Sequence, residues 1–510
     1  RIPEFTEFGL FVNPFGGDDA TRQNRAVMRG AFDWLRDGHV LGIFPAGEVA
    51  SYSWKQRCVT DPAWSTTVAR FAARANAPVV PVFFDGTNRL RFHLVGMVHP
   101  RLRTALLPRE MVARSGRPLR AVVGNPISQK RLAQFGQAAT SRDTAERDIT
   151  EYLRLRTYVL RGRLHEKKTQ DSTDTSLAPH VGAKVAHEIV APISPAVLAT
   201  ELGALPLDAL LVSHNELRVY CARAAEIPQS LREIGRLREV TFRAVGEGTG
   251  NAIDLDRFDS HYHHLLVWDA TQQRILGSYR MGCTDEIVSR FGISGLYTST
   301  LFRFRQKLIR QINPAIELGR SFVVRDAQKS YAALMLLWKG IGAFVAKHPR
   351  YRNLYGVVSI SDGFTSMTKE LLVQFLQANR FDRDRAKLVH AKNPPKLAPF
   401  RDLEMRALST IVDDVKDVDE LVREIEADRA AVPVLVRQYL KLNARFLGFN
   451  VDPDFGDVLD GLVFVDLKNV DRDVLDRFIG KDETAEFLAM HSEGATDMSR
   501  DLKNPRRPAL

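Results

Sequence analysis

The stretch 263-HHLLVWDATQQRILGSYRMG-282 holds two runs of apolar and aromatic residues on either side of the short segment Ala270–Gln273. Two such runs separated by a few turn residues are typical of antiparallel strands joined in a hairpin. Further elements expected around it are strands at 216–224, 353–361 and 462–470 and a helix within 326–349. This mixture predicts an α+β domain built on a mixed sheet.

The N-terminal third follows a different pattern, in which helices and strands alternate. The segment "HVLGIF" (39–44) reads as a buried strand that ends at Pro45, because proline cannot donate to a strand ladder. Asp61 and the proline after it are placed to start a helix over 61–77. The other expected elements are helices at 17–38 and 141–164 and strands at 78–86 and 119–127. The alternation predicts an α/β domain.

Length and composition agree with a globular protein of several domains. The chain has 510 residues, of which 45% are hydrophobic and 26% charged. A polar stretch rich in Ser, Thr and Asp separates two regions and reads as a linker. We therefore expect a first domain at 1–165, a linker at 166–200, a second domain at 201–490 and a disordered tail at 491–510.

Charge is distributed unevenly along the chain. Residues 1–168 hold 27 Lys and Arg against 15 Asp and Glu, whereas the rest holds 45 against 46. A basic region of this kind favours an anionic partner, and no nucleic-acid-binding motif accompanies it. The apolar run 331–346 is interrupted by Lys339, so it predicts a buried helix rather than a membrane span. The segment 91–114 mixes arginines with apolar residues, which suits either an anionic membrane surface or an ordinary surface helix.

The stretch "FPAGEVAS" (44–51) resembles the third motif of the lysophosphatidate-type glycerolipid acyltransferases. In that motif Phe44, Pro45, Gly47 and Ser51 stand in place, Ala46 replaces the usual glutamate, and Glu48 follows two residues later. The resemblance covers about residues 1–165 and implies that this turn holds the substrate's head group. On this resemblance the expected substrate-binding residues of the first domain are Phe44, Pro45, Gly47, Glu48 and Ser51. A purely structural Glu48 is the alternative.

The same family uses a histidine in a His-x₄-Asp motif as general base, because a hydroxyl is a poor nucleophile until a base takes its proton. No histidine precedes His39 in this chain, and none stands at that spacing in the right place. We expect the motif to lie upstream of Arg1, in a part of the protein that the sequence does not include; the alternative is a first domain without the base.

The second domain resembles the GNAT-type N-acyltransferases of ornithine-lipid synthesis and the related acyl-homoserine-lactone synthases. The resemblance rests on "LREVTFRAVGEGTG" (237–250), "DLDRFDSHYHHLLVWD" (254–269), "GSYRMG" (277–282) and "ELGRSFV" (317–323). The segment 432–467 resembles the C-terminal part of the ornithine-type enzymes, and the lactone synthases are shorter. The expected catalytic carboxylates are Asp256, Asp259 and Glu317, and the expected substrate-binding arginines are Arg238, Arg280 and Arg320.

These residue types suit amide formation from a thioester. Carboxylates can orient a cationic amine and accept its proton, and arginines can hold a carboxylate in a bidentate pair. An internal salt-bridge network is the alternative for each of them. The histidines of "HYHH" (261–264) alternate between the faces of a strand, so no shared metal is expected. The glycines of "WKGIGAF" (338–344) read as helix packing rather than as a phosphate cradle.

Together the two resemblances predict a bifunctional ornithine-lipid-synthase-type acyltransferase, related to chains labelled as hemolysins. The second domain would form an amide on an ornithine-like amine, and the first would esterify the 3-hydroxyl of the new chain. No bound cofactor is expected; the acyl donor would be an acyl carrier protein or coenzyme A thioester. We expect a cytoplasmic protein, peripheral to an anionic inner membrane and without nucleic-acid partners. The alternatives are a non-catalytic membrane-associated protein with degenerate acyltransferase folds and a lactone-synthase-like enzyme.

Overall fold

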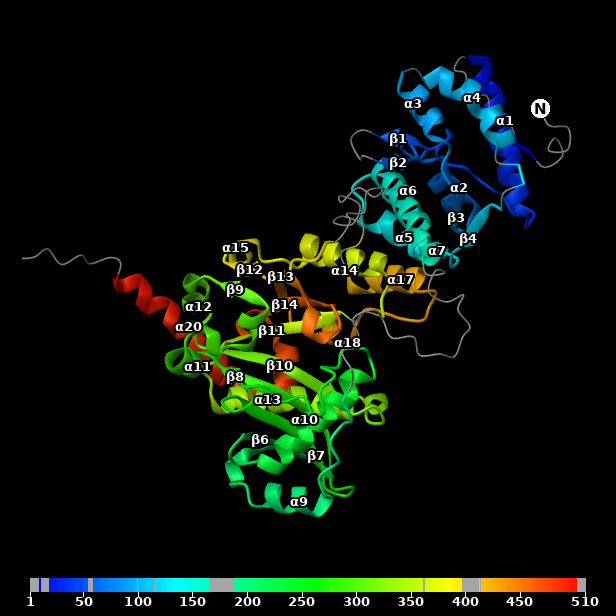
Figure 1. Ribbon diagram of the computed structural model, residues 1–510. Helices are drawn as coiled ribbons and strands as arrows, with labels where there is room; N and C mark the ends of the chain where they lie inside the picture. The colour runs from blue at the N-terminus through cyan, green and yellow to red at the C-terminus, as the bar shows by residue number, and fades with distance from the viewer. Residues whose placement is uncertain are drawn as a thin grey trace, which may run out of the picture. The chain divides into compact units, whose positions relative to one another are not determined.

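The computed structural model describes residues 9–10, 18–53, 58–98, 100–113, 115–116, 118–165, 187–360, 363–396, 412 and 414–501. The chain forms two compact units (Figure 1). Unit 1 comprises Arg1–Ser172 and Ala398–Ala431, and unit 2 comprises Thr173–Leu397 and Val432–Leu510. Each unit therefore contains two separate parts of the sequence.

Unit 1 is mainly helical and carries two short antiparallel strand pairs, β1–β2 and β3–β4. Helix α6 is central to its core and begins at the cap residue Ser141, whose hydroxyl accepts a hydrogen bond from the backbone N–H of Thr144. Tyr152 and Leu155 of this helix are buried. The elements of unit 1 are α1 (Asp18–Arg36), β1 (Ser51–Ser53), β2 (Cys58–Thr60), α2 (Thr67–Ala75), β3 (Val82–Asp85), α3 (Leu90–Val98), α4 (Pro100–Ala113), β4 (Arg120–Val123), α5 (Gln129–Ala138), α6 (Arg142–Tyr158), η2 (Val159–Arg161), α7 (Gly162–His165) and α17 (Val415–Ile425).

The strand expected at 39–44 does not form, and this prediction was wrong. Val40 is 90% exposed and Phe44 is 80% exposed, and no described strand pairs with this segment. Apolar character alone does not make a strand, because the backbone also needs a hydrogen-bonding neighbour. The helix start expected at Asp61 was also wrong: α2 begins at Thr67, and the Asp61 carboxylate instead accepts a hydrogen bond from the indole N–H of Trp64.

Helix α17 belongs to unit 1, although the sequence placed its residues in the second domain. Its residue Glu424 is fully buried and pairs with Arg156 of α6 and with Arg163 of α7. Asp417, in the first turn of α17, pairs with Arg131 of α5. These ion pairs join segments more than 250 residues apart, which sequence periodicity does not reveal.

Unit 2 is built on an eight-stranded mixed sheet with the order β13-β14-β11-β10-β8-β7-β6-β5. Strands from the middle of the chain, in green, lie beside strands from its end, in orange (Figure 1). All neighbouring strands are antiparallel except β10 and β11, which are parallel. The strands are β5 (Leu210–His214), β6 (Leu217–Arg223), β7 (His263–Asp269), β8 (Arg274–Cys283), β10 (Ala315–Val323), β11 (Asn353–Ile360), β13 (Arg445–Asp452) and β14 (Val458–Asp466), with a separate pair β9 (Phe302–Phe304) and β12 (Val389–Ala391). The β7–β8 hairpin and the mixed sheet are as the sequence predicted.

Strands β10 and β11 separate partway along their length. Their ladder runs from the pair Ala315 and Asn353 to the pair Leu318 and Gly356, and it does not continue beyond. Strand β11 stays paired with β14 as far as Ile360, and β10 stays paired with β8 after a bulge between Gly319 and Phe322. The sheet therefore opens between β10 and β11 toward their carboxyl ends, where backbone groups of both strands lack a ladder partner in the other.

Helix α13 packs against the sheet through its glycines. A side chain at Gly340 would lie 2.7 Å from Val219 of β6, so only glycine allows this approach. This confirms the packing role predicted for the glycines of residues 338–344. The remaining helices of unit 2 are α9 (Pro195–Gly203), α10 (Pro228–Arg243), α11 (Thr284–Phe291), α12 (Gln306–Ile312), α13 (Ala332–Lys347), α14 (Ser366–Asn379), α15 (Arg383–Ala386), α18 (Val434–Lys441), α19 (Arg472–Phe478) and α20 (Lys481–Asp501).

Two boundaries differ from those expected. The linker expected at 166–200 lies outside the described residues as far as 186, and its last part forms the start of α9. The tail expected from 491 is helical as far as Asp501 because α20 continues through it, and residues 502–510 lie outside the described part. Among the described residues, no helix has the length and hydropathy needed to cross a membrane.

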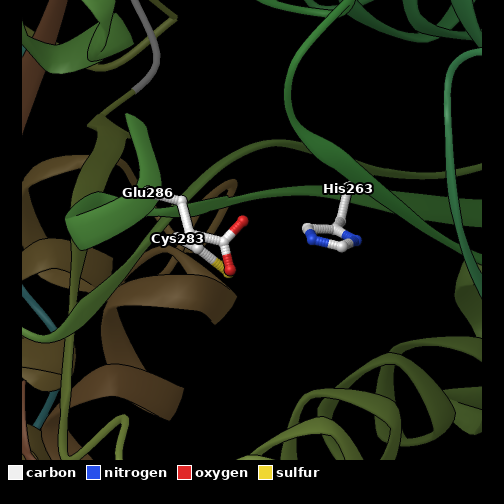
Figure 2. A group of neighbouring side chains, drawn as sticks. All are labelled: His263, Cys283 and Glu286. Carbon is white, nitrogen blue, oxygen red and sulfur yellow. The ribbon is translucent and has the colours of Figure 1, made fainter. Parts of the chain in front are cut away.

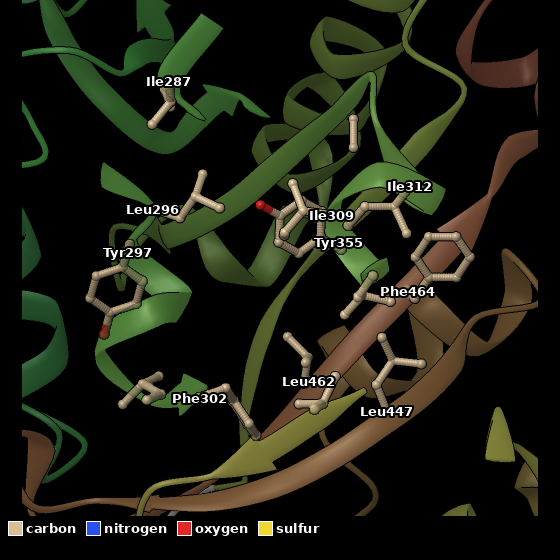
Figure 3. Packing of buried hydrophobic residues seen from close by; sticks show 14 of the residues in the cluster. Ile287, Leu296, Tyr297, Phe302, Ile309, Ile312, Tyr355, Leu447, Leu462 and Phe464 are labelled. Carbon is tan, nitrogen blue, oxygen red and sulfur yellow. The ribbon is translucent and has the colours of Figure 1, made fainter. Parts of the chain in front are cut away.

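An apolar cluster fills one region of unit 2 beside the β10–β11 opening. Tyr355 of β11 and Leu462 and Phe464 of β14 belong to it (Figure 3). It also includes Tyr297, in the 3₁₀ turn η5 (Tyr297–Thr300). The polar residues described next lie at the border of this cluster.

Candidate functional site

Arg320 lies at the bulge of β10, where the sheet opens. Its backbone adopts φ +49°, a left-handed conformation that costs a non-glycine residue energy and is concentrated at functional sites. Its guanidinium lies 4.7 Å from the ring centre of Tyr297 and 4.1 Å from that of Phe455, and it donates a hydrogen bond to the Tyr297 hydroxyl. Two aromatic faces therefore fix the position of this cation.

Four of the expected residues form one buried ion network next to Arg320. Arg238 of α10 donates to Asp259 at 2.8 Å, and Arg280 of β8 donates to Asp256 at 2.6 Å. Arg280 also lies 3.2 Å from Asp259. Arg320 reaches toward the same group, with its guanidinium 3.6 Å from Asp256. The structure therefore brings together these five residues that the sequence resemblance singled out.

The network holds the Asp259 carboxylate in the charged form. Burial alone would raise the pKa of Asp259, but the charges of Arg238 and Arg280 outweigh burial and lower that pKa. The Asp259 carboxylate also accepts the backbone N–H of Asp256 at 2.8 Å. A carboxylate with a lowered pKa is a weak proton acceptor at neutral pH, so Asp259 suits a bracing role better than a catalytic one.

Glu317 is buried and fully engaged by hydrogen bonds. Its carboxylate accepts the hydroxyl of Tyr262 and the backbone N–H groups of Tyr297 and Thr298, the last at 2.6 Å. Burial followed by the charge of Glu317 raises the pKa of Tyr262 well above its usual value. Glu317 therefore holds the turn that carries Tyr297, which in turn supports Arg320.

Three further carboxyl groups lie around Arg320, and sequence reasoning did not select them. Asp254 has a carboxylate oxygen 3.6 Å from Nε of Arg320. Asp452 ends β13, and Asp460 lies within β14, where its carboxylate accepts the hydroxyl of Ser359 at 2.8 Å. Asp254 precedes Asp256 by two residues within the stretch 254–269, so the sequence could have identified it as a site residue. Asp460 stands inside an apolar strand, and no pattern marked it.

Asp460 differs electrostatically from the other carboxyl groups. Burial raises its pKa to about 7, and the negative charges of Asp452 and Glu247 add to this, while the Ser359 hydroxyl and Arg320 oppose it. An acid whose pKa lies near neutrality can accept and release a proton under ordinary conditions. Asp460 is therefore the member of this group best placed for proton transfer.

The residues expected as a substrate site in unit 1 form a turn. Gly47 adopts φ +66°, and its N–H donates to the carbonyl of Phe44 at 3.2 Å. The carbonyl of Pro45 accepts the N–H of Ser65, and Ser51 begins β1. The turn predicted from Gly47 is therefore present, whereas the strand before it is not. Binding of a substrate head group by this turn, with Glu48 as a member, stays a prediction.

One group of side chains in unit 2 has ligand types that metals prefer. The imidazole of His263 faces the thiol of Cys283 and the carboxylate of Glu286 (Figure 2), with their ligand atoms within 4.8 Å of one another. Glu286 is already paired with Arg223 at 3.0 Å and with Arg350 at 3.1 Å. Two guanidinium groups on the one carboxylate oppose a divalent cation, so an ion-pair network explains this group better than a metal centre does.

Comparisons with known proteins agree with the fold of unit 2. The family model for the GNAT acetyltransferase domain matches residues 237–339. The chain is 30% identical to the glycine N(α)-acyltransferase of Phocaeicola vulgatus, over 60% of this chain and 95% of that protein. It is 32% identical to the glycine N(α)-acyltransferase of Bacteroides thetaiotaomicron, over 53% of this chain and 83% of that protein. It is 31% identical to the L-ornithine N(α)-acyltransferase of Rhodobacter capsulatus, over 28% of this chain and 56% of that protein. No solved structure matches the chain significantly.

Proposed function

The chain is an acyltransferase of the family that includes the glycine N(α)-acyltransferases, and on that premise we propose that it acylates the α-amino group of a small amino acid in lipid synthesis. The acyl group would come from a thioester. The acceptor would be glycine or ornithine, the amino acids after which the related acyltransferases are named. The observation that carries the proposal is Arg320, held at the opening of the sheet among several carboxyl groups.

The opening between β10 and β11 suits an extended thioester. Beyond Leu318 and Gly356 the two strands offer backbone N–H and C=O groups that do not pair with each other. An extended, amide-containing chain can satisfy such groups in the way that an added strand does. Arg325 and Lys329 lie in the segment between the end of β10 and the start of α13, and a helix N-terminus preceded by cations favours an anionic group of the donor.

The charges around Arg320 suit a zwitterionic amino acid. A guanidinium can bind the substrate's carboxylate through two parallel hydrogen bonds, and Nε of Arg320 has no hydrogen-bond partner among the described residues. The carboxyl groups of Asp254 and Asp256, each 3.6 Å from Arg320, would then face the ammonium group. An amine without a carboxylate would lack the hydrogen bonds to Arg320.

For unit 1 the proposal is a second acylation, on a hydroxyl group, and attachment to a membrane. The motif at Phe44–Ser51 supports a glycerolipid-acyltransferase-like module that esterifies a hydroxyl in the intact protein. Helices α3 and α4 expose Leu90, Leu94, Met111 and Val112. Together with exposed arginines such as Arg91, these side chains support peripheral attachment to an anionic membrane, with an acyl carrier protein or coenzyme A as donor.

An acceptor panel tests the proposed function. The full chain would be incubated with an acyl-carrier-protein or coenzyme A thioester and with glycine, ornithine, ethylamine or glycolate, and products would be identified by mass spectrometry. We expect N-acyl glycine or N-acyl ornithine, far less product from ethylamine, which lacks a carboxylate, and none from glycolate, which lacks an amine. Equal use of ethylamine would contradict the role of Arg320, and the absence of any amide would contradict the proposed function.

A further inference from the structure

We propose that Asp460 is the catalytic group that accepts the proton of the attacking amine. This inference rests on the proposed function, because it assigns a step of the same reaction. It adds a residue from β14, which lies outside the part of the chain that matches the GNAT domain model.

The strand register places Asp460 at the opening of the sheet. On β14, Phe464, Leu462 and Asp460 share one face because side chains alternate along a strand. Phe464 stands opposite Tyr355 of β11, and Asp460 stands opposite Ser359. The row therefore leads from the apolar cluster (Figure 3) to the end where β10 and β11 have separated.

Arg320 and Asp460 occupy opposite borders of this opening. Arg320 stands two residues after Leu318, the last β10 residue that pairs with β11. The Asp460 carboxylate accepts a hydrogen bond from Ser359, on the β11 side. The charge of Arg320 lowers the pKa of Asp460, so the two groups lie within reach of electrostatic interaction. An amino acid held by its carboxylate on Arg320 would place its amine within the opening, between the carboxyl groups beside Arg320 and that of Asp460.

The neighbours of Asp460 set its proton affinity. Burial is the main cause of the raised pKa of Asp460, which is about 7. The Ser359 hydroxyl on β11 has the next largest effect and lowers this pKa. Asp452 on β13 and Glu247 after α10 raise the pKa further, and Arg320 on β10 lowers it. Tyr297 on η5 faces the same group, and its own pKa is raised, mainly by burial, so it stays protonated.

The other carboxyl groups described around this site are less suited to accept a proton. Glu317 already accepts three hydrogen bonds, and Asp259 is held in its charged form by Arg238 and Arg280. Asp256 accepts from Arg280 and from the backbone N–H of Phe258. The carboxylate of Asp460, in contrast, accepts one hydrogen bond from the described residues, that of the Ser359 hydroxyl.

The step balances without any further reactant. The amine nitrogen attacks the thioester carbonyl, and the N–C bond forms while the C–S bond breaks. The substrate amine reacts in its neutral form, and the proton that leaves its nitrogen passes to the Asp460 carboxylate. Asp460 then gives this same proton to the departing thiolate, so the products are one amide and one thiol.

The test is the pH dependence of amide formation from glycine by the full chain. In wild type we expect kcat to fall below about pH 7, as the Asp460 carboxylate becomes protonated. Asp460→Asn should lower kcat by about 100-fold or more and remove this acidic limb. Asp384→Asn, on a surface side chain that is 93% exposed, is the matched control and should leave both unchanged.

Two neighbouring variants keep the test decisive if Asp460→Asn fails to fold. Ser359→Ala removes a donor that favours the charged carboxylate, so the limb should move to higher pH. Asp452→Asn removes a negative charge, so the limb should move to lower pH. Shifts in these opposite directions support the proposal. If the acidic limb stays in place in both variants, or if Asp460→Asn keeps full activity, Asp460 is not the proton acceptor, and the proposed function is unaffected. If wild type forms no amide, the proposed function itself is wrong.

Discussion

Each unit buries a carboxyl group, and the two groups are compensated differently. Glu424 in unit 1 is fully buried and is bound by two guanidinium groups, those of Arg156 and Arg163, and by the backbone N–H of Asn125. Asp460 in unit 2 is 3% exposed, is hydrogen bonded to a hydroxyl, and has acidic neighbours. Both carboxyl groups lie inside the protein, but only one has its charge matched.

This difference separates a structural group from a reactive one. A buried carboxylate with paired cations stays ionised and holds its surroundings together. A buried carboxyl group without such pairing is protonated more easily, and its pKa moves toward the range that proton transfer needs. Burial of a charge therefore does not indicate function by itself; the balance of charges around it does.

The largest effect is expected from Glu424→Ala. The change removes the buried partner of Arg156, which keeps the half-exposed Glu420 at 3.7 Å as its ion-pair partner, and breaking a buried ion pair in this way costs about 3–5 kcal/mol in the free energy of unfolding. Denaturant unfolding of the full chain measures it. Asp419→Ala on the same helix removes a pair with Arg423, which is 47% exposed, and should cost about 1 kcal/mol or less. Equal costs would show that the buried pair has no special structural role.

Glu317→Gln should affect both stability and activity. The neutral amide cannot serve all three donors that the carboxylate binds, so we expect a loss of about 1–3 kcal/mol and a roughly tenfold fall in amide formation. Because Glu317 acts by holding Tyr297, the acidic limb of the pH profile should keep its position. A lost limb in this variant would make Glu317, rather than Asp460, the proton acceptor.

Asp460→Asn should stabilise the protein at high pH. Because the folded-state pKa is raised to about 7, the stability that the protonated carboxyl contributes is present below about pH 4 and is lost as the pH rises through 7. Asparagine cannot ionise, so the advantage of the variant over wild type should be larger at pH 8 than at pH 5 by on the order of 3 kcal/mol, at about 1.4 kcal/mol per pKa unit. Thermal unfolding at both pH values measures this gain. If the stability difference between Asp460→Asn and wild type were smaller at pH 8 than at pH 5, the raised pKa of Asp460 would be contradicted.

The smallest effect concerns the surface of unit 1. Reversing Arg91 or Arg109 to glutamate should weaken binding of the full chain to anionic vesicles by about 1 kcal/mol or somewhat more per residue. The wild-type binding should also fall with salt, because exposed charges are screened. Arg310→Glu in unit 2 is the matched control. Co-sedimentation measures all three, and equal binding to neutral vesicles would show that charge does not direct attachment.

The sequence predicted the parts of the structure that local patterns encode. The β7–β8 hairpin follows from its apolar runs, and the motif that contains Arg238, Asp259 and Arg280 predicted residues that do meet in space. Asp460 was missed because its role depends on burial and on neighbours such as Ser359 of β11, which lies about 100 residues earlier in the sequence. Helix α17 was misplaced for the same reason, since Glu424 finds its partners in the first unit. The strand at 39–44 failed because its pattern did not supply a pairing neighbour.

The most direct test of the central distinction is the rate of amide formation per folded molecule, measured side by side in Glu424→Ala and Asp460→Asn. We predict that Glu424→Ala, although less stable, acylates glycine at close to the wild-type rate under conditions where it is folded. Asp460→Asn should be well folded and about 100-fold slower or more. A slow Glu424→Ala together with a fully active Asp460→Asn would contradict the assignment of structural and reactive carboxyl groups.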